Sequence, residues 1–385
     1  MRRTTRILAA TSLLMAGVFS TSAVAADRPI RIGAIIATSG PAAFIGAAEE
    51  KTLHMIADEK NTQGGLAGHP IELIIYDTEG NSTKATQLAR RLVESDNVDI
   101  VMGPSTTGES LAVKPIFEEA EIPTISFAAG EKVVVPVSPY VFKVPPTDRV
   151  VLDHMFGFFA KSNFNSVAIL HASDGFGQGA ADIMPAIAEA HGIEIKTMES
   201  HAPKDTDYTP QLLALRNSGA DAVMYWGNNP GPTLFVRSAK SLGINKPLFN
   251  GYSAATVEFI DQSGQAAEGT YVSSMHLLAR ESMKPDNPQT PVITKLADDY
   301  NKKFGSYPPT FAGHPADAMA ILEAALKSVG GEFDGASLRD AIEKVEIQGA
   351  NGFFRFTAQN HNGLDEKSGS MIMLKVENGK YVPAE

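Results

Sequence analysis

The chain lacks several features that would place it in common classes of protein. None of its 385 residues is cysteine, so it can hold neither a disulfide nor a lipid attached to a cysteine. After the N-terminal segment it has no apolar run of about 18 residues, the length that a membrane-spanning helix needs. Its nine histidines show neither the H-x-x-x-H nor the H-E-x-x-H spacing, so no metal site and no cofactor is expected.

The N-terminal segment has the pattern of a secretory signal peptide. Three arginines among the first six residues precede an apolar run over 7–19 and the small residues "AVA" before Ala26. We expect cleavage near Ala25 and a mature protein that is free in a bacterial periplasm. Cleavage would take the formal net charge from −11 to −14. So acidic a surface argues against nucleic acid and anionic membranes as partners.

Short apolar strands alternate with amphipathic helices along the rest of the chain, which predicts an α/β fold with parallel sheets. The first series of strands lies at 31–38, 71–77, 98–103 and 123–129, with helices at 46–60 and 82–94. The second series lies at 166–172, 193–200, 220–227, 246–251 and 269–276, followed by helices at 290–304 and 313–329. Ser82 is a candidate N-cap, and Asn378-Gly379 predicts a final hairpin.

The predicted domain boundaries lie where this alternation of strands and helices is interrupted. Pro145 and Pro146 fix the backbone after the first series and suit a segment that crosses between two lobes. We predict two similar lobes, with crossovers near residues 145, 275 and 358. Lobe 1 then comprises residues 26–145 and 276–357, and lobe 2 comprises residues 146–275 and 358–385.

The stretch "VMGPSTTGESLAV", residues 101–113, is the first candidate site. A strand runs into Ser105, Thr106 and Thr107, and a helix pattern follows. The N-terminus of a helix presents unpaired N–H groups and a partial positive charge, so this cluster of hydroxyls suits a carboxylate. A phosphate loop is disfavoured because no Gly-Lys-Ser/Thr follows, and the G-x-S-x-G nucleophile elbow is absent. For any one of these hydroxyls, simple helix capping is the alternative interpretation.

Further candidates lie at the ends of other predicted strands. "SFAAG", residues 126–130, has small residues that let a ligand approach the backbone, or form an ordinary tight turn. "DGFGQGA" matches a loose dinucleotide fingerprint without an acidic ribose partner, and is interpreted as a helix-opening loop with Phe176 facing a cleft. Trp226 and Asn228 follow another strand, although a lone tryptophan is more often part of a core. Tyr252 occupies the equivalent place after the next strand.

These motifs together resemble the solute-binding proteins of branched-chain amino-acid type ABC importers. The resemblance covers nearly the whole mature chain and rests on "SGPAAFIG", "YDTEGNSTKATQLARRLV", "IVMGPSTTGESLAVKPIFEEAEIPTISFAA" and "DGFGQG" in that order. It implies a type I periplasmic binding protein, with two Rossmann-like lobes joined by three crossovers and closing on a ligand. It also implies a membrane permease of an ABC importer as partner, no catalytic residue, and a monomer.

The resemblance also places ligand-binding residues by position. Thr107 falls where the family uses a Ser or Thr hydroxyl to hold the ligand carboxylate, and Ala128 falls where a backbone group does the same. Four positions depart from the amino-acid binders: Gly130 replaces a Thr, Phe176 and Asn228 each replace a Tyr, and Tyr252 replaces the Glu that pairs with the ligand's ammonium group.

The missing glutamate argues against a leucine-like ligand, because a buried ammonium group without a carboxylate partner would cost several kcal/mol. The preferred ligand is therefore a flat aromatic acid between the rings of Phe44, Phe176, Trp226 and Tyr252, since ring stacking adds roughly 0.5–1.5 kcal/mol. Four other carboxylates remain as possible ammonium partners: Glu109, Asp174, Asp207 and Asp317.

Two alternatives stay open from the sequence. A secreted α/β hydrolase could use Ser105 or Thr107 with a histidine, but no local spacing arranges Ser, His and Asp for catalysis. A branched-chain amino-acid binder or a sensory module could have the same lobes.

Overall fold

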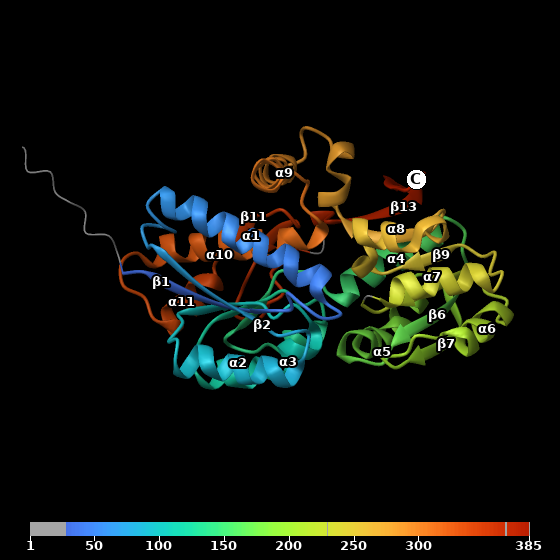
Figure 1. The fold of residues 1–385 in the computed structure, drawn as a ribbon, viewed down its shortest axis with the longest axis horizontal. Coiled ribbons are helices and arrows are strands. Elements are labelled where there is room, and N and C mark those ends of the chain that lie inside the picture. Colours follow the sequence, from blue (N-terminus) through green and yellow to red (C-terminus); the bar gives the residue numbers. More distant parts are fainter. Residues whose placement is uncertain (1–27, 229, 366–367, 385) are drawn as a thin grey trace, which may run out of the picture.

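The computed structural model describes residues 28–228, 230–365 and 368–384. It consists of two α/β lobes that lie side by side (Figure 1). The predicted signal peptide, residues 1–25, lies outside the described residues. Within the described residues no helix is long and apolar enough to cross a membrane.

Lobe 1 is built on a five-stranded parallel sheet with the order β2-β1-β3-β4-β5. The strands are β1 (Ile30–Ile36), β2 (Ile71–Asp77), β3 (Ile100–Met102), β4 (Thr124–Ser126) and β5 (Val141–Lys143). The helices are α1 (Ala43–Thr62), α2 (Ser82–Glu94), α3 (Thr107–Glu119), α9 (Thr290–Phe304), α10 (Gly313–Val329) and α11 (Gly335–Ile342). The 3-10 turns η1 (Glu131–Val133) and η5 (Thr310–Ala312) and the hairpin β11 (Glu346–Gln348) and β12 (Phe353–Arg355) complete it.

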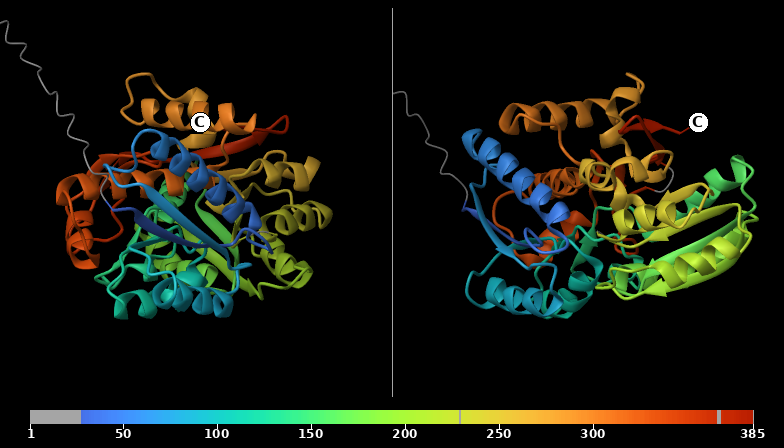
Figure 2. Two further views of the ribbon diagram at one scale, coloured as in Figure 1. Left: turned by 60° about the vertical axis from the view of Figure 1, so that its left-hand side comes forward. Right: turned by 45° about the vertical axis from the view of Figure 1, so that its right-hand side comes forward.

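Apolar packing fixes the layers of lobe 1. Helices α1, α10 and α11 pack on one face of the sheet in the core around Ile32, Leu322 and Phe354, and α2 and α3 pack on the other face around Leu92 and Phe117. Figure 1 shows the two helical layers above and below the strands. Helix α9 lies outside these layers, and Figure 2 shows it in orange, well away from the strands.

Lobe 2 is built on a seven-stranded sheet with the order β14-β13-β10-β9-β8-β6-β7. Its strands are β6 (Ser166–Ala172), β7 (Glu194–His201), β8 (Ala222–Trp226), β9 (Leu248–Asn250), β10 (Tyr271–Met275), β13 (Met371–Glu377) and β14 (Lys380–Pro383). Strands β6 to β10 are parallel to one another, whereas β13 and β14 are antiparallel additions at the edge.

Helices cover both faces of this second sheet. They are α4 (Asp148–Lys161), α5 (Gly175–Ala190), α6 (Thr209–Asn217), α7 (Gly231–Ser241) and α8 (Val257–Ser263), with the turns η2 (Tyr252–Ala254), η3 (Gly264–Ala267) and η4 (His276–Ser282). Helices α4 and α5 share one core with the sheet, and α6, α7 and α8 share the other. The chain passes between the two sheets after β5, after β10 and after β12.

The observed elements confirm the predicted α/β fold class with two lobes. The predicted final hairpin is present, with Asn378 and Gly379 at φ values of 54° and 70°, as a tight β-hairpin turn requires. The N-cap of α2 was predicted wrongly: it is Asn81, whose side chain accepts hydrogen bonds from the backbone N–H groups of Thr83 and Lys84. Helix α11 and the β11–β12 hairpin were not predicted, because short elements carry little periodicity.

Candidate functional site

A narrow cavity lies between the two lobes. Most of its lining residues follow the carboxyl ends of parallel strands in both lobes, where ligands of open α/β sheets bind. The lining comprises Ile45, Ser105, Thr106, Thr107, Phe127, Ala129, Phe176, Asn228, Tyr252, Ser253 and Phe311.

The hydroxyl groups of Ser105, Thr106 and Thr107, at the start of α3, differ in their hydrogen-bond partners. Ser105 Oγ accepts a hydrogen bond from Ala37 N at 3.1 Å and donates to Glu49 Oε2 at 2.5 Å. Thr106 caps α3 and donates to Glu109 Oε2 at 2.6 Å. Thr107 Oγ1 accepts from Gly130 N at 3.1 Å. Among the described residues Thr107 has no acceptor for its own hydrogen, so that hydrogen can be donated to a ligand.

Gly130 is fixed as glycine by its contact with Thr107. A Cβ atom at Gly130 would lie 2.3 Å from Thr107 Cγ2 and 2.8 Å from Oγ1. A larger residue at position 130 would therefore require the Thr107 side chain to move.

Aromatic rings form one wall of the cavity. Phe176 lies edge-on to Tyr252, with 6.4 Å between ring centroids, and Tyr252 lies 6.1 Å from Phe311. Trp226 is completely buried and stacks on Phe176 at 5.4 Å, so it supports the wall from behind. Phe44 packs against Phe311 at 5.6 Å.

Six of the ten predicted ligand residues therefore line one cavity, and four lie beside it. The lining residues are Ser105, Thr106, Thr107, Phe176, Asn228 and Tyr252; those beside it are Phe44, Ala128, Gly130 and Trp226. Ala129, one position after Ala128, lines the cavity instead. Ile45, Phe127, Ser253 and Phe311 also line it and were missed. Phe311 comes from the turn before α10, about 200 residues after Thr107 along the chain, and no local pattern connects the two.

None of the four carboxylates left open as ammonium partners lines the cavity itself, but Asp174 lines the adjoining cleft that shares Thr107 and Phe176 with it. Asp174 caps α5 by accepting from the N–H groups of Phe176 and Gly177, and Asp207 binds the N–H of Thr209 at the surface. Asp317 is buried and accepts from the N–H groups of Ala350 and Asn351. Glu109 is buried against Thr106. Tyr252 lines the cavity, whereas none of these four carboxylates does.

Behind the cavity lies a pair of buried ionisable groups that the sequence did not reveal. Glu49 and His314 are both fully buried, with 3.7 Å between Glu49 Oε1 and His314 Nδ1. Burial raises the pKa of Glu49 to about 8, against a smaller opposing effect of the Ser105 hydrogen bond. Burial, with a smaller contribution from the charge of Lys143, lowers the pKa of His314 to about 3. Both groups are therefore neutral at pH 7, and they do not form an ion pair.

A second buried pair links the cavity to the first crossover. Lys143 is completely buried at the end of β5 and donates to Ala129 O at 3.0 Å and to Pro145 O at 2.8 Å. Asp148 is buried in the first turn of α4, in the other lobe. Burial lowers the pKa of Lys143 and raises that of Asp148, and the attraction between their charges opposes both shifts.

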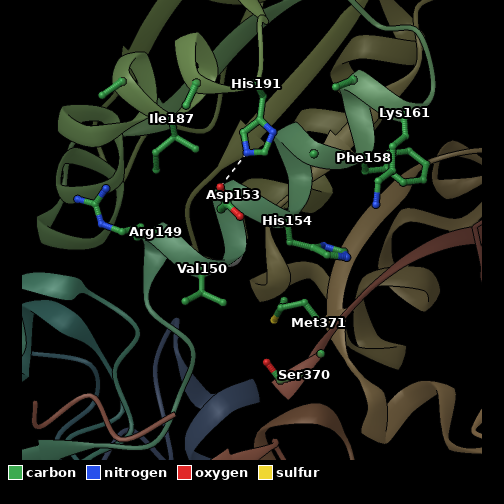
Figure 3. Close-up of a pocket in the computed structure, with 15 residues that line it drawn as sticks. Arg149, Val150, Asp153, His154, Phe158, Lys161, Ile187, His191, Ser370 and Met371 are labelled. Carbon is green, nitrogen blue, oxygen red and sulfur yellow. Dashed lines mark hydrogen bonds and ion pairs between the residues drawn. The ribbon is translucent and has the colours of Figure 1, made fainter. Parts of the chain in front are cut away.

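Two larger depressions are present. A cleft of about 320 Å³ adjoins the cavity, shares Thr106, Thr107, Phe176 and Asn228 with it, and extends to Lys204. A groove of about 770 Å³ lies in lobe 2 between α4, α5 and the start of β13 (Figure 3). In this groove His191 contacts Asp153, and none of the predicted ligand residues lines it.

An ion pair crosses between the lobes beside the cavity. Lys132 of η1 lies 2.7 Å from Asp182 of α5, and both side chains are about half exposed. We expect Lys132→Glu to weaken ligand binding by about two- to fivefold, because like charges would then oppose the closed arrangement. Isothermal titration at low and high salt would measure this, since salt screens exposed charges. The double variant Lys132→Glu/Asp182→Lys should restore affinity; equal affinity in all three proteins would contradict the prediction.

The described residues contain no group of three or more His, Asp or Glu side chains placed to hold a metal ion.

Comparison with known proteins gives matches over nearly the whole chain. Residues 29–380 match the family model described as "Periplasmic binding protein". A "Leu/Ile/Val-binding protein homolog 7" from Brucella suis is 24% identical over 382 residues, covering 94% of this chain and 92% of that protein.

Three solved structures are similar over nearly their whole length. An extracellular ligand-binding receptor from Rhodopseudomonas palustris HaA2 has a TM-score of 0.85 and 29% identity, covering 92% of this chain and 99% of that one. The branched-chain amino acid transporter substrate binding protein LivJ from Streptococcus pneumoniae, solved with isoleucine, has a TM-score of 0.81 and 25% identity. The match covers 93% of this chain and 99% of that one. A solute-binding protein from R. palustris, solved with benzoate, has a TM-score of 0.79 and 20% identity. The match covers 92% of this chain and 95% of that one. At 20% identity the last likeness concerns the fold alone.

Proposed function

The chain belongs to the periplasmic binding protein family, a family of solute-binding proteins rather than enzymes, and we propose that it captures a small aromatic carboxylate between its lobes. In this proposal the protein acts as a monomer in the periplasm, after cleavage near Ala25. It delivers the ligand to the membrane permease of an ABC importer.

One observation carries the choice of ligand. The cavity offers the hydroxyl hydrogen of Thr107 beside the rings of Phe176, Tyr252 and Phe311, and no carboxylate lines it. A hydroxyl donor suits a carboxylate, and aromatic faces suit a flat ring. An α-ammonium group would find no counter-ion among the lining residues and would cost several kcal/mol to bury. The benzoate complex of a protein with the same fold is compatible with this ligand class.

A branched-chain amino acid is the second candidate, favoured by the names of the relatives and by the isoleucine complex. A thermal-shift screen of residues 26–385 separates the two. Benzoate, 4-hydroxybenzoate and cinnamate would be compared with leucine, isoleucine and valine. A ligand at 100 times its Kd stabilises by about 2.7 kcal/mol, which raises the Tm by several degrees. A shift with aromatic acids alone supports the proposal, whereas a shift with leucine alone overturns it.

Thr107 provides the most direct mutational test of this proposal. Thr107→Val should weaken aromatic-acid binding by about tenfold or more, because a charge-assisted hydrogen bond contributes roughly 1.5–3 kcal/mol. The matched control is Thr107→Ser, which keeps the hydroxyl and should bind within about threefold of the original protein. Titration calorimetry at 25 °C gives both values. Equal affinities for the valine and serine variants would remove Thr107 from the site.

A further inference from the structure

Glu49 occupies a position that affects the proposed ligand class although it does not touch the cavity. It lies on α1, fully buried, directly behind Ser105, which lines the cavity. Its Oε2 accepts the Ser105 hydroxyl hydrogen, and its Oε1 has no hydrogen-bond partner in the described residues. This carboxyl group is therefore one hydrogen bond away from a side chain that lines the cavity.

Among the described residues no lysine or arginine contacts Glu49 to compensate a negative charge on it. The facing groups are His314 from α10, Glu109 from α3 and Tyr252 from η2, and of these Glu109 is itself acidic. Both ring nitrogens of His314 lack hydrogen-bond partners, and the nearby Lys143 disfavours a charge on that ring. A buried carboxylate with one hydroxyl donor and no counter-ion is costly, so Glu49 keeps its proton.

We infer that Glu49 determines which charge the cavity accepts: with its proton it admits an anionic carboxylate, and without it the buried charge excludes that ligand. The inference rests on the proposed function. When the ligand meets the ionised form, binding takes up one proton from solvent onto the Glu49 carboxylate. The opposite case would be an ammonium ligand, which an ionised Glu49 would stabilise through Ser105. Glu49 is thus a specificity-determining residue that acts on the ligand through the Ser105 hydroxyl.

The test is the pH dependence of benzoate binding, measured by titration calorimetry between pH 6.5 and 9.5. Benzoate stays ionised throughout this range, so only protein groups titrate. With half of Glu49 ionised near pH 8, the competent fraction falls about tenfold between pH 7 and pH 9. We expect the Kd to rise about tenfold over that interval, and Glu49→Gln, which cannot ionise, to lose the rise above pH 8. Lys143 and Asp148 titrate equally in both proteins and cancel in the comparison.

Two further measurements keep the test decisive. Glu50→Gln, one residue along α1 and only partly buried, should retain the pH dependence of the original protein. In the original protein, calorimetry at pH 8.5 in two buffers of different ionisation enthalpy should show net proton uptake, which requires no variant to fold.

Identical pH profiles in the original protein and in Glu49→Gln, with benzoate bound by both, would overturn this inference and leave the proposed function intact. Leucine binding that strengthens with pH and is lost in Glu49→Gln would overturn the proposed aromatic-acid ligand, because Glu49 would then be the counter-ion of an ammonium group. A folded protein that binds no carboxylate at any pH would instead contradict the proposed function.

Discussion

Replacing Lys143 by methionine is expected to lower the free energy of unfolding by about 3–5 kcal/mol. The lysine is completely buried, and its ammonium group holds Ala129 O of the cavity wall and Pro145 O of the first crossover. Methionine fills a similar volume but donates no hydrogen bond, so both carbonyls lose their partner. Asp148 would then remain as a buried acid without a nearby cation.

The control is the double variant Lys143→Met/Asp148→Asn, in which neither position carries a charge. Urea denaturation at pH 8 should show that the second change recovers part of the lost stability, although the two carbonyls remain without a donor. Equal stability of the single variant and the original protein would contradict the prediction, and so would a double variant less stable than the single one.

The pH dependence of Lys143→Met gives an independent check. Burial raises the pKa of Asp148 in the folded state above its unfolded value near 4, so the folded protein binds more protons than the unfolded one between these pKa values. Stability therefore falls as pH rises through this window. Without the lysine the folded pKa of Asp148 rises further and the window widens. The single variant should regain stability at pH 5 relative to pH 8, by more than the double variant does.

The same side chain joins the cavity wall to the first crossover. Lys143 ends the last strand of lobe 1, Pro145 lies in the crossover, and Asp148 begins the first helix of lobe 2. A change in the charge of this pair therefore acts on the segment about which the lobes would open. Proteins of two lobes usually close by changes at a few such residues. Because Ala129 lines the cavity and Pro145 belongs to the crossover, the two hydrogen bonds of Lys143 hold these two segments together.

Much of this fold could be predicted because its periodic signals are local. Alternating strand and helix patterns identify βαβ units, and paired prolines mark the first crossover. Glu49 was not predicted as a buried group, although it lies four residues from Ile45 and from Leu53 on the buried face of α1.

The site was less predictable because its parts come from both lobes. Thr107 and Phe176 follow strands of different sheets, and strand ends alone indicated them. Phe311 and Lys143 carry no such signal: one lies in a short turn, the other on a strand that would usually bury only apolar side chains. Trp226 matched the pattern of a ligand wall, but its place behind Phe176 depends on packing that the sequence does not encode locally.

The second large effect is expected at Gly177, in the first turn of α5. A Cβ atom there would lie 1.9 Å from the backbone oxygen of Ala172, at the end of β6. Because backbone cannot rotate aside as a side chain can, Gly177→Ala should push α5 away from the strand and cost about 3 kcal/mol of unfolding free energy. Phe176 would move with the helix, so benzoate affinity should fall by at least about tenfold. Urea denaturation and titration calorimetry measure the two effects.

Gly179 in the same helix supplies the matched control. A Cβ atom at Gly179 meets nothing closer than Asp148 Oδ2, at 3.9 Å, and alanine is a better helix former than glycine by about 1 kcal/mol. Gly179→Ala should therefore be neutral or stabilising and should bind benzoate normally. Equal losses of stability in the two variants would indicate a general effect of substitution in α5 rather than the close contact between Gly177 and β6. Their divergence would show that this glycine motif serves the packing of helix on strand, which positions Phe176, rather than the binding of a phosphate.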